Sequence, residues 1–139
     1  MLFHVDRRRA PEPRTVLQPY ARPFARRDRA FKDRYFAAAE RAKKAGLDGI
    51  EVHAANGYFL LSFVSRVWNH RDDQYGCQSV ENRTRLVCEI IRGVKERCGE
   101  DFIVGVARMA RIRHPDAITI EEAWRSRSST MLPEPTASA

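Results

Sequence analysis

Apolar residues in the middle of the chain recur with two different periods, and each period predicts one kind of element. From Asp28 to Gly46 they repeat at helical spacing, with Lys and Arg on the other side and in the last turn, which predicts a helix that Gly46 ends. A second helix is predicted from Ser79, a favourable N-cap, to Gly99. The apolar stripes of the two helices are Phe31, Tyr35, Ala38, Ala39, Ala42 and Ala45, then Val80, Val87, Ile90, Ile91, Val94 and Cys98.

Two short strands are predicted beside these helices. Residues 47–53 (LDGIEVH) end in an apolar alternation, and residues 101–107 (DFIVGVA) form a nearly continuous apolar run, typical of a parallel strand buried on both faces. Residues 57–78 read as a short helical turn followed by a polar loop. The order helix, strand, loop, helix, strand is typical of βα units in a parallel sheet and predicts an α/β fold.

The two ends of the chain lack such periodicity. Residues 1–30 contain four prolines and are predicted to be an irregular arm, residues 31–110 to be the folded segment, and residues 111–139 to be a disordered tail rich in Ser, Thr and Pro. One further helical turn is predicted within the tail, starting at Thr119 or Ile120.

Composition narrows the classes of function. The 139 residues suit one domain, and the arm, with eight Arg against three acidic residues, accounts for +5 of the net charge of +7. A basic arm on a nearly neutral body disfavours nucleic-acid recognition, although binding of acidic partners by the arm stays an alternative. The three cysteines are spaced eleven and ten residues apart, which fits neither disulfides nor a metal site and predicts reduced thiols in a cytoplasmic protein. No membrane span and no signal peptide are expected.

Polar residues cluster where the first predicted strand ends. His53 and Asn56 can both point at one oxygen and polarise a carbonyl, and Tyr58 can give up a proton, with Gly57 allowing the backbone to turn. The spacing alone favours the alternative, a capped turn with His53 in the core and Tyr58 packed against it. Arg108 ends the second strand, where it is either a cation aimed at an anionic ligand or a surface residue.

Three linked motifs resemble the old yellow enzyme family, also called the NADH:flavin oxidoreductase family. The first is the strand-end motif of residues 53–58, the second lies in residues 69–76, and the third in residues 81–85. The resemblance covers about residues 31–109. The matching residues are His53, Asn56, Gly57 and Tyr58, then Asn69, Arg71, Asp73, Tyr75 and Gly76, then Glu81, Asn82, Arg83 and Arg85.

The resemblance implies a flavoenzyme built as a (β/α)₈ TIM barrel that holds FMN. Hydride would pass from NAD(P)H through FMN to an activated alkene, a small molecule. The resemblance implies that His53 and Asn56 bind the substrate carbonyl, that Tyr58 donates the proton and that Arg108 contacts the flavin. The loop motifs are predicted to be structural.

Four departures from the family pattern accompany the resemblance. A complete barrel takes about 250 residues, so this chain is predicted to be a partial barrel of about two βα units with a preceding helix. Cys77 replaces a Gly, and its segment has one residue more than the common spacing. Arg66 stands where the family commonly has Pro. Arg108 comes one residue late, so that either the strand carries a bulge or the side chain faces the other way.

These departures lead to two hypotheses about activity. The first is a fragment of an FMN-dependent ene-reductase with impaired or no activity of its own, doubtful in its retention of FMN, and derived from a truncated or frameshifted gene product. The alternative is a non-catalytic barrel piece that acts by association with itself or with another chain through its exposed sheet edges.

Overall fold

The computed structural model describes residues 25–108, 118–119 and 121–122, with side chains from residue 29 onward. Its elements follow the predicted order, and the predicted helical turn after the first strand is the short helix α2. In chain order they are α1 (Ala25–Lys44), β1 (Gly49–Ala54), α2 (Phe59–Val64), α3 (Val80–Cys98) and β2 (Ile103–Arg108).

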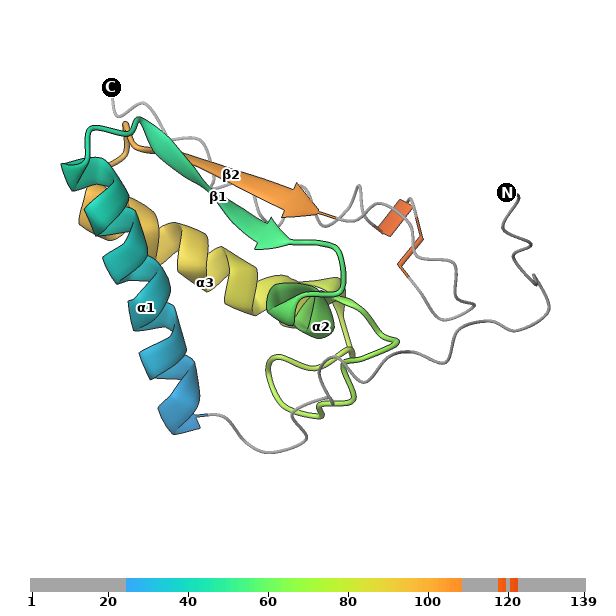
Figure 1. The fold of residues 1–139 in the computed structure, drawn as a ribbon. Helices are drawn as coiled ribbons and strands as arrows, with labels where there is room; N and C mark the ends of the chain where they lie inside the picture. The colour runs from blue at the N-terminus through green and yellow to red at the C-terminus, as the bar shows by residue number, and fades with distance from the viewer. Residues whose placement is uncertain (1–24, 109–117, 120, 123–139) are drawn as a thin grey trace, which may run out of the picture.

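The two strands form a parallel pair whose register runs without a break from Gly49 opposite Ile103 to Ala54 opposite Arg108. Helices α1 and α3 lie side by side along one face of this pair, and α2 lies near the carboxyl ends of the strands (Figure 1). The described part of the chain therefore has two layers, and none of its helices covers the second face of the sheet.

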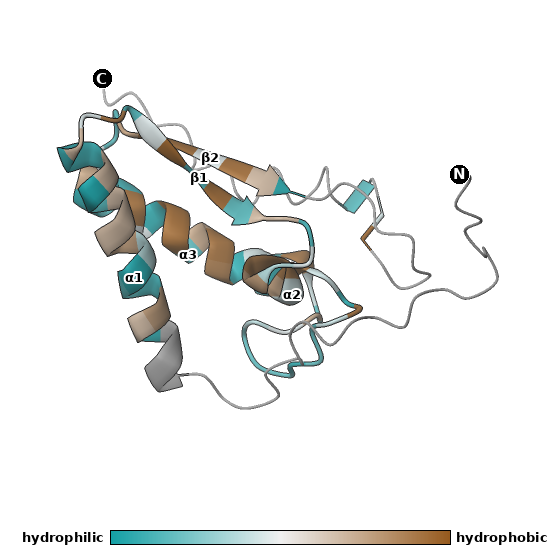
Figure 2. Ribbon diagram, viewed as in Figure 1, coloured by the Kyte–Doolittle hydropathy of each residue, from teal (hydrophilic) through white to brown (hydrophobic). Residues whose placement is uncertain are grey.

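The core fills the space between the sheet and the helices, where the apolar faces of α3 and of the strands meet (Figure 2). Gly93 on α3 lets α1 approach closely, because a Cβ atom there would lie 2.3 Å from the Phe36 ring. The buried members of the core are Ala39, Val52, Ala54, Leu60, Phe63, Tyr75, Leu86, Val87, Ile90, Ile91, Val94, Cys98 and Phe102.

The structure corrects three details of the predicted elements. Helix α1 begins at Ala25, inside the segment predicted to be irregular, because the last proline is Pro23 and the Ala and Arg residues that follow favour a helix. Ala38 and Ala45 are exposed, although both were predicted in the apolar stripe, whereas Ala39 is fully buried. Strand β2 is not buried on both faces: Ile103 is 63% exposed because the helices cover only the opposite face.

Candidate functional site

A tight turn carries the chain from β1 into α2. Asn56 and Gly57 both have positive φ angles, 56° and 76°, and the Tyr58 N–H donates to the Ala55 carbonyl at 3.2 Å. Asn and Gly are the residues that adopt this left-handed conformation at the least cost. Tyr58 then stands at the N-cap position of α2 without a side-chain capping bond. The turn thus brings the residues that follow it back toward the strand end.

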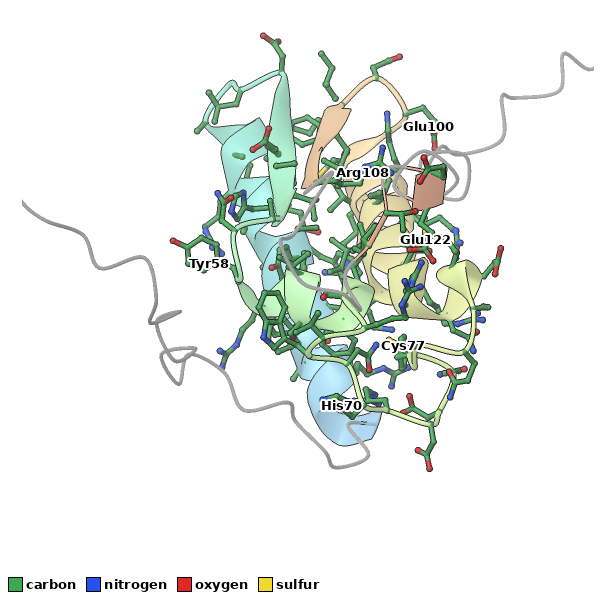
Figure 3. All side chains as sticks on the ribbon, turned by 90° about the vertical axis from the view of Figure 1, so that its right-hand side faces the viewer. Tyr58, His70, Cys77, Glu100, Arg108 and Glu122 are labelled. Carbon is green, nitrogen blue, oxygen red and sulfur yellow. The ribbon has the colours of Figure 1, made fainter. Side chains whose placement is uncertain are left out.

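The aromatic rings of His53 and Tyr58 lie together at this turn. Their centroids are 5.2 Å apart at an interplanar angle of 54°. Val52 and Ala54 are buried toward the helices, so strand alternation places His53 on the face that no described helix covers. Tyr58 is 58% exposed, and Figure 3 shows it at the rim of the molecule.

The polar groups of this turn are available to a ligand. Among the described residues, the side chains of His53, Asn56 and Tyr58 make no hydrogen bond, and Asn56 is exposed. An imidazole, an amide and a phenol near one strand end can bind a carbonyl oxygen and supply a proton. The structure shows the His53 and Tyr58 rings together, and the roles of the three residues stay a prediction.

Arg108 is not brought to the same face as His53. The unbroken register between Gly49 and Ala54 on β1 and Ile103 and Arg108 on β2 leaves no room for a bulge in this pairing. Alternation then assigns Arg108 to the side of Val106, which packs against the core, and Ala107 is the residue opposite His53. Alternation favours the direction that faces away from His53, and Arg108 is exposed at the end of β2, so its role stays a prediction.

The second motif, in residues 69–76, is held by hydrogen bonds to neighbouring parts of the chain. The buried Asn69 amide donates to the carbonyls of Phe63 and Tyr75 at 2.6 and 2.8 Å, and its oxygen accepts from the Arg71 N–H at 3.1 Å. The Tyr75 hydroxyl donates to Glu89 on α3 at 3.0 Å. These bonds fasten the loop to α2 and α3, which confirms that the motif is structural.

An ion pair stiffens the same loop. Arg71 donates two hydrogen bonds to the Asp73 carboxylate, and its guanidinium lies 5.5 Å from the ring centroids of Phe63 and Tyr75. The Asp73 carboxylate also accepts from the Tyr75 N–H at 3.0 Å. The hydrogen bonds from Arg71 hold the pKa of Asp73 below its ordinary value.

The third motif starts α3 and reaches a residue that the sequence reasoning missed. The Ser79 hydroxyl accepts from the Asn82 N–H at 3.1 Å, as predicted for an N-cap. Arg83 is buried and pairs with Glu122 at 3.2 Å. The helical turn predicted to start at Thr119 or Ile120 is present at residues 121–122, and the Thr119-x-x-Glu122 pattern is the signal of a capping box. That local pattern does not predict the ion pair with Arg83, which lies far away in the sequence.

Other places among the described residues are weaker candidates for a ligand site. A hollow of about 260 Å³ lies between α1 and α3, on the helix side of the sheet, and its three cationic and three anionic side chains balance. The described part of the chain holds no group of three His, Cys, Asp or Glu residues that could bind a metal, and Cys77, Cys88 and Cys98 form no disulfide within it. None of the described helices is long and apolar enough to cross a membrane.

Comparison with known proteins identifies the family. Residues 25–131 match the sequence model of the NADH:flavin oxidoreductase / NADH oxidase family. The chain belongs to this family. The match extends at both ends beyond residues 31–109, on which the three motifs lie.

Individual relatives agree with this assignment. Over 93 residues the chain is 42% identical to an NADPH dehydrogenase of Geobacillus thermodenitrificans, a match that covers 67% of this chain and 25% of the relative. Over 70 residues it is 51% identical to a cinnamate reductase of Clostridium sporogenes, covering 50% of this chain and 10% of the relative. An old yellow enzyme homologue from Zymomonas mobilis superposes with a TM-score of 0.64 at 31% identity, over 73% of this chain and 29% of that one.

The coverage defines what part of the family fold is present. The chain spans a quarter or less of the length of these two sequence relatives. Its two strands, with the helices on one face, are a partial (β/α)₈ barrel, and the uncovered face of the sheet is the side on which His53 lies. The conserved architecture of such barrels places ligands at the carboxyl ends of the strands, which is where the His53–Tyr58 turn lies.

Proposed function

We propose that the chain carries the substrate-binding and proton-donating part of an FMN-dependent NAD(P)H oxidoreductase of the ene-reductase type. The observation that carries this proposal is the contact between the His53 and Tyr58 rings at the carboxyl end of β1, with their polar atoms unengaged by the described residues. The cinnamate reductase among its relatives is named for the reduction of an alkene conjugated to a carboxylate.

The turn residues have distinct roles in the proposal. His53 and Asn56 donate hydrogen bonds to the carbonyl oxygen of an activated alkene and stabilise the negative charge that develops there. Tyr58, whose phenol is exposed beside the imidazole, donates a proton to the alkene carbon next to that carbonyl. Asn56, which supplies the amide, lies between His53 and Tyr58 in the sequence and is one of the two residues of the turn with a left-handed backbone.

The described residues fit the substrate side of this reaction better than the cofactor side. When bound, FMN supplies the hydride, which it receives from NAD(P)H. The residue predicted to contact the flavin is Arg108, which is exposed at the end of β2 and which strand alternation assigns to the face opposite to that of His53. The proposal therefore uses no flavin contact of this chain. We propose that FMN retention by the isolated chain is weak and its activity impaired or absent.

A segment exchange tests the proposed site. The aligned segment of the Geobacillus thermodenitrificans NADPH dehydrogenase is replaced by that of this chain, and reduction of an α,β-unsaturated carbonyl compound by NADPH is followed. We expect Tyr58→Phe in the exchanged protein to lower kcat about 100-fold, while FMN stoichiometry stays constant, because the phenol supplies the proton. Tyr35→Phe on α1 is the matched control and leaves kcat unchanged. Equal rates for the two variants would refute the proposed role of Tyr58.

The isolated chain tests the second half of the proposal. Purified with excess FMN and then passed through a desalting column, it is expected to lose the cofactor, because two strands leave the barrel interior open. A yellow sample with one FMN per chain and alkene reductase activity would contradict this.

A second candidate function is favoured by the exposed sheet. Ile103 and Tyr58 are more than half exposed, Glu51 is exposed on the same face as His53, and β1 and β2 pair only with each other among the described residues. Open strand edges and an apolar side chain on an uncovered face are typical of surfaces that pair with another chain. In this candidate the chain is a non-catalytic barrel piece that associates with itself or completes another partial barrel. Light scattering after size-exclusion chromatography decides: a stable monomer argues against self-association.

A further inference from the structure

Three segments of the chain meet at the carboxylate of Glu122. Arg66, in the turn after α2, donates two hydrogen bonds to it, the second at 3.1 Å. Arg83 on α3 approaches the same carboxylate at 3.2 Å. The N–H of Thr119 donates to it at 3.1 Å, while the Glu122 N–H donates to the Thr119 hydroxyl at 3.2 Å. We name Arg66, Arg83 and Glu122 the Glu122 cluster.

Burial makes Glu122 the critical member of this cluster. The Arg83 side chain is only 3% exposed, whereas those of Glu122 and Arg66 are 22% and 35% exposed. A buried guanidinium requires a fixed counter-charge, because removing its partner leaves an uncompensated charge in the interior. The hydrogen bonds from Arg66 lower the pKa of Glu122 to about 2, so the carboxylate is ionised at neutral pH.

Two departures of this chain from the family pattern meet at the cluster. Arg66 stands where Pro is common, and Pro could not donate to a carboxylate. Cys77, which replaces a Gly, lies near enough for the charges of Arg83 and Arg66 to favour its thiolate, although burial has the larger effect and raises the pKa of the thiol. Figure 3 shows Cys77 and Glu122 in the same half of the view, with Tyr58 in the other half.

The cluster joins the part of the chain that follows β1 to the part that follows β2. Tyr58 stands at the N-cap position of α2, and Arg66 follows directly after Ser65, the fully buried residue at the end of this helix. Glu122 belongs to the segment that follows β2, which carries Ala107 opposite His53.

We propose that Glu122 is a positioning residue, which through Arg66 and Arg83 fixes the segment after β2 against the end of α2 and the start of α3. The inference rests on these contacts and not on the proposed function. It predicts that loss of the carboxylate releases residues 118–119 and 121–122 locally and lets Arg66 and Arg83 move, which changes the surroundings of Cys77, while the other described residues stay folded.

Hydrogen exchange on the full chain tests this proposal. In Glu122→Gln the side-chain oxygen can still accept from the Thr119 N–H, so the capping box alone would persist, but both ion pairs are lost. We expect the amides of residues 118–122 to exchange about tenfold faster, as a local opening requires. Arg66→Gln, at a residue a third exposed, is expected to act in the same direction, and Arg66→Lys to restore slow exchange.

A thiol reagent supplies a second readout in the same samples. Iodoacetamide labelling of Cys77 is expected to rise about tenfold in Glu122→Gln relative to Cys88, which is also partly buried. Glu100→Gln removes the same charge at an exposed residue and is expected to change neither readout. The proposal is overturned if exchange at residues 118–122 is unchanged, or if all three cysteines and all peptides respond equally, since that would be global destabilisation.

Discussion

The loop of residues 69–76 and the turn of residues 53–58 look alike in sequence and differ in the folded chain. Both are dense in Asn, Tyr and charged or ring side chains, and both belong to motifs of the same family. In the loop, Asn69 is buried and makes three hydrogen bonds to the backbone. In the turn, Asn56 is exposed and makes none with the described residues.

This difference separates residues that hold the fold from residues offered to a ligand. A buried polar group must find its partners within the protein, because leaving it unpaired costs more than the bond itself contributes. A polar group at the carboxyl end of a barrel strand can keep its bonding capacity for a substrate. The loop therefore fixes α2 and α3 in place, whereas in the proposed function the turn offers its side chains to the substrate. Substitutions in the two regions should accordingly differ in what they damage.

The largest effect is expected from Asn69→Ala. The substitution removes the buried amide that donates to the carbonyls of Phe63 and Tyr75. It also removes the oxygen that accepts from the Arg71 N–H. We expect a loss of about 3 kcal/mol in the free energy of unfolding, because the freed backbone groups stay desolvated. Urea denaturation followed by circular dichroism measures it. Asn56→Gly is the control, since Gly accepts the left-handed φ of 56°, and an equal loss there would end the distinction between the regions.

A smaller and pH-dependent effect is expected from Asp73→Asn. The pKa of Asp73 lies below its ordinary value of 3.8 in the folded chain, chiefly because Arg71 donates hydrogen bonds to it. A depressed folded pKa stabilises the fold above pH 3.8, and this contribution is lost as the pH falls through the folded value. Since the carboxylate is 38% exposed, we expect only about 1 kcal/mol at pH 7.

The pH series has a matched control next to the variant. Asp72 is exposed and adjacent, so Asp72→Asn makes the same change of charge outside the ion pair. Denaturation midpoints of the parent chain and of Asp72→Asn should both fall as the pH is lowered below 4, and Asp73→Asn should fall less steeply. Parallel curves for all three proteins would show that the Arg71–Asp73 pair adds no stability to the loop.

Most of the fold follows from local sequence pattern. The period of the apolar residues gave both long helices and both strands, and the N-cap Ser79 was predicted from residue type alone. The start of α1 was missed because Arg-rich sequence beside prolines resembles an irregular segment as much as a helix. The exposure of Ile103 was missed because an apolar strand implies a second covered face, which the described residues do not provide.

Only those contacts of the candidate site that join residues close in the sequence could be predicted. His53 and Tyr58 are five residues apart, so the turn alone brings their rings together. The direction of Arg108 depends on the pairing of two strands 54 residues apart in the chain, and a shift by one residue reverses it. The contact between Arg66 and Glu122 likewise spans 56 residues, and no local pattern specifies it.

The smallest effect is expected where one substitution is made in both regions. Tyr58→Phe removes a hydroxyl that is exposed, so we expect the free energy of unfolding to change by no more than about 0.5 kcal/mol. Tyr75→Phe removes a buried hydroxyl that donates to Glu89, itself paired with Lys32, and is expected to cost about 1 kcal/mol. Because the same atom is deleted, side-chain volume and chemistry cancel in the comparison. If Tyr58→Phe destabilised the chain as much as Tyr75→Phe, the phenol at the strand end would be part of the fold, and its availability to a substrate would have to be abandoned.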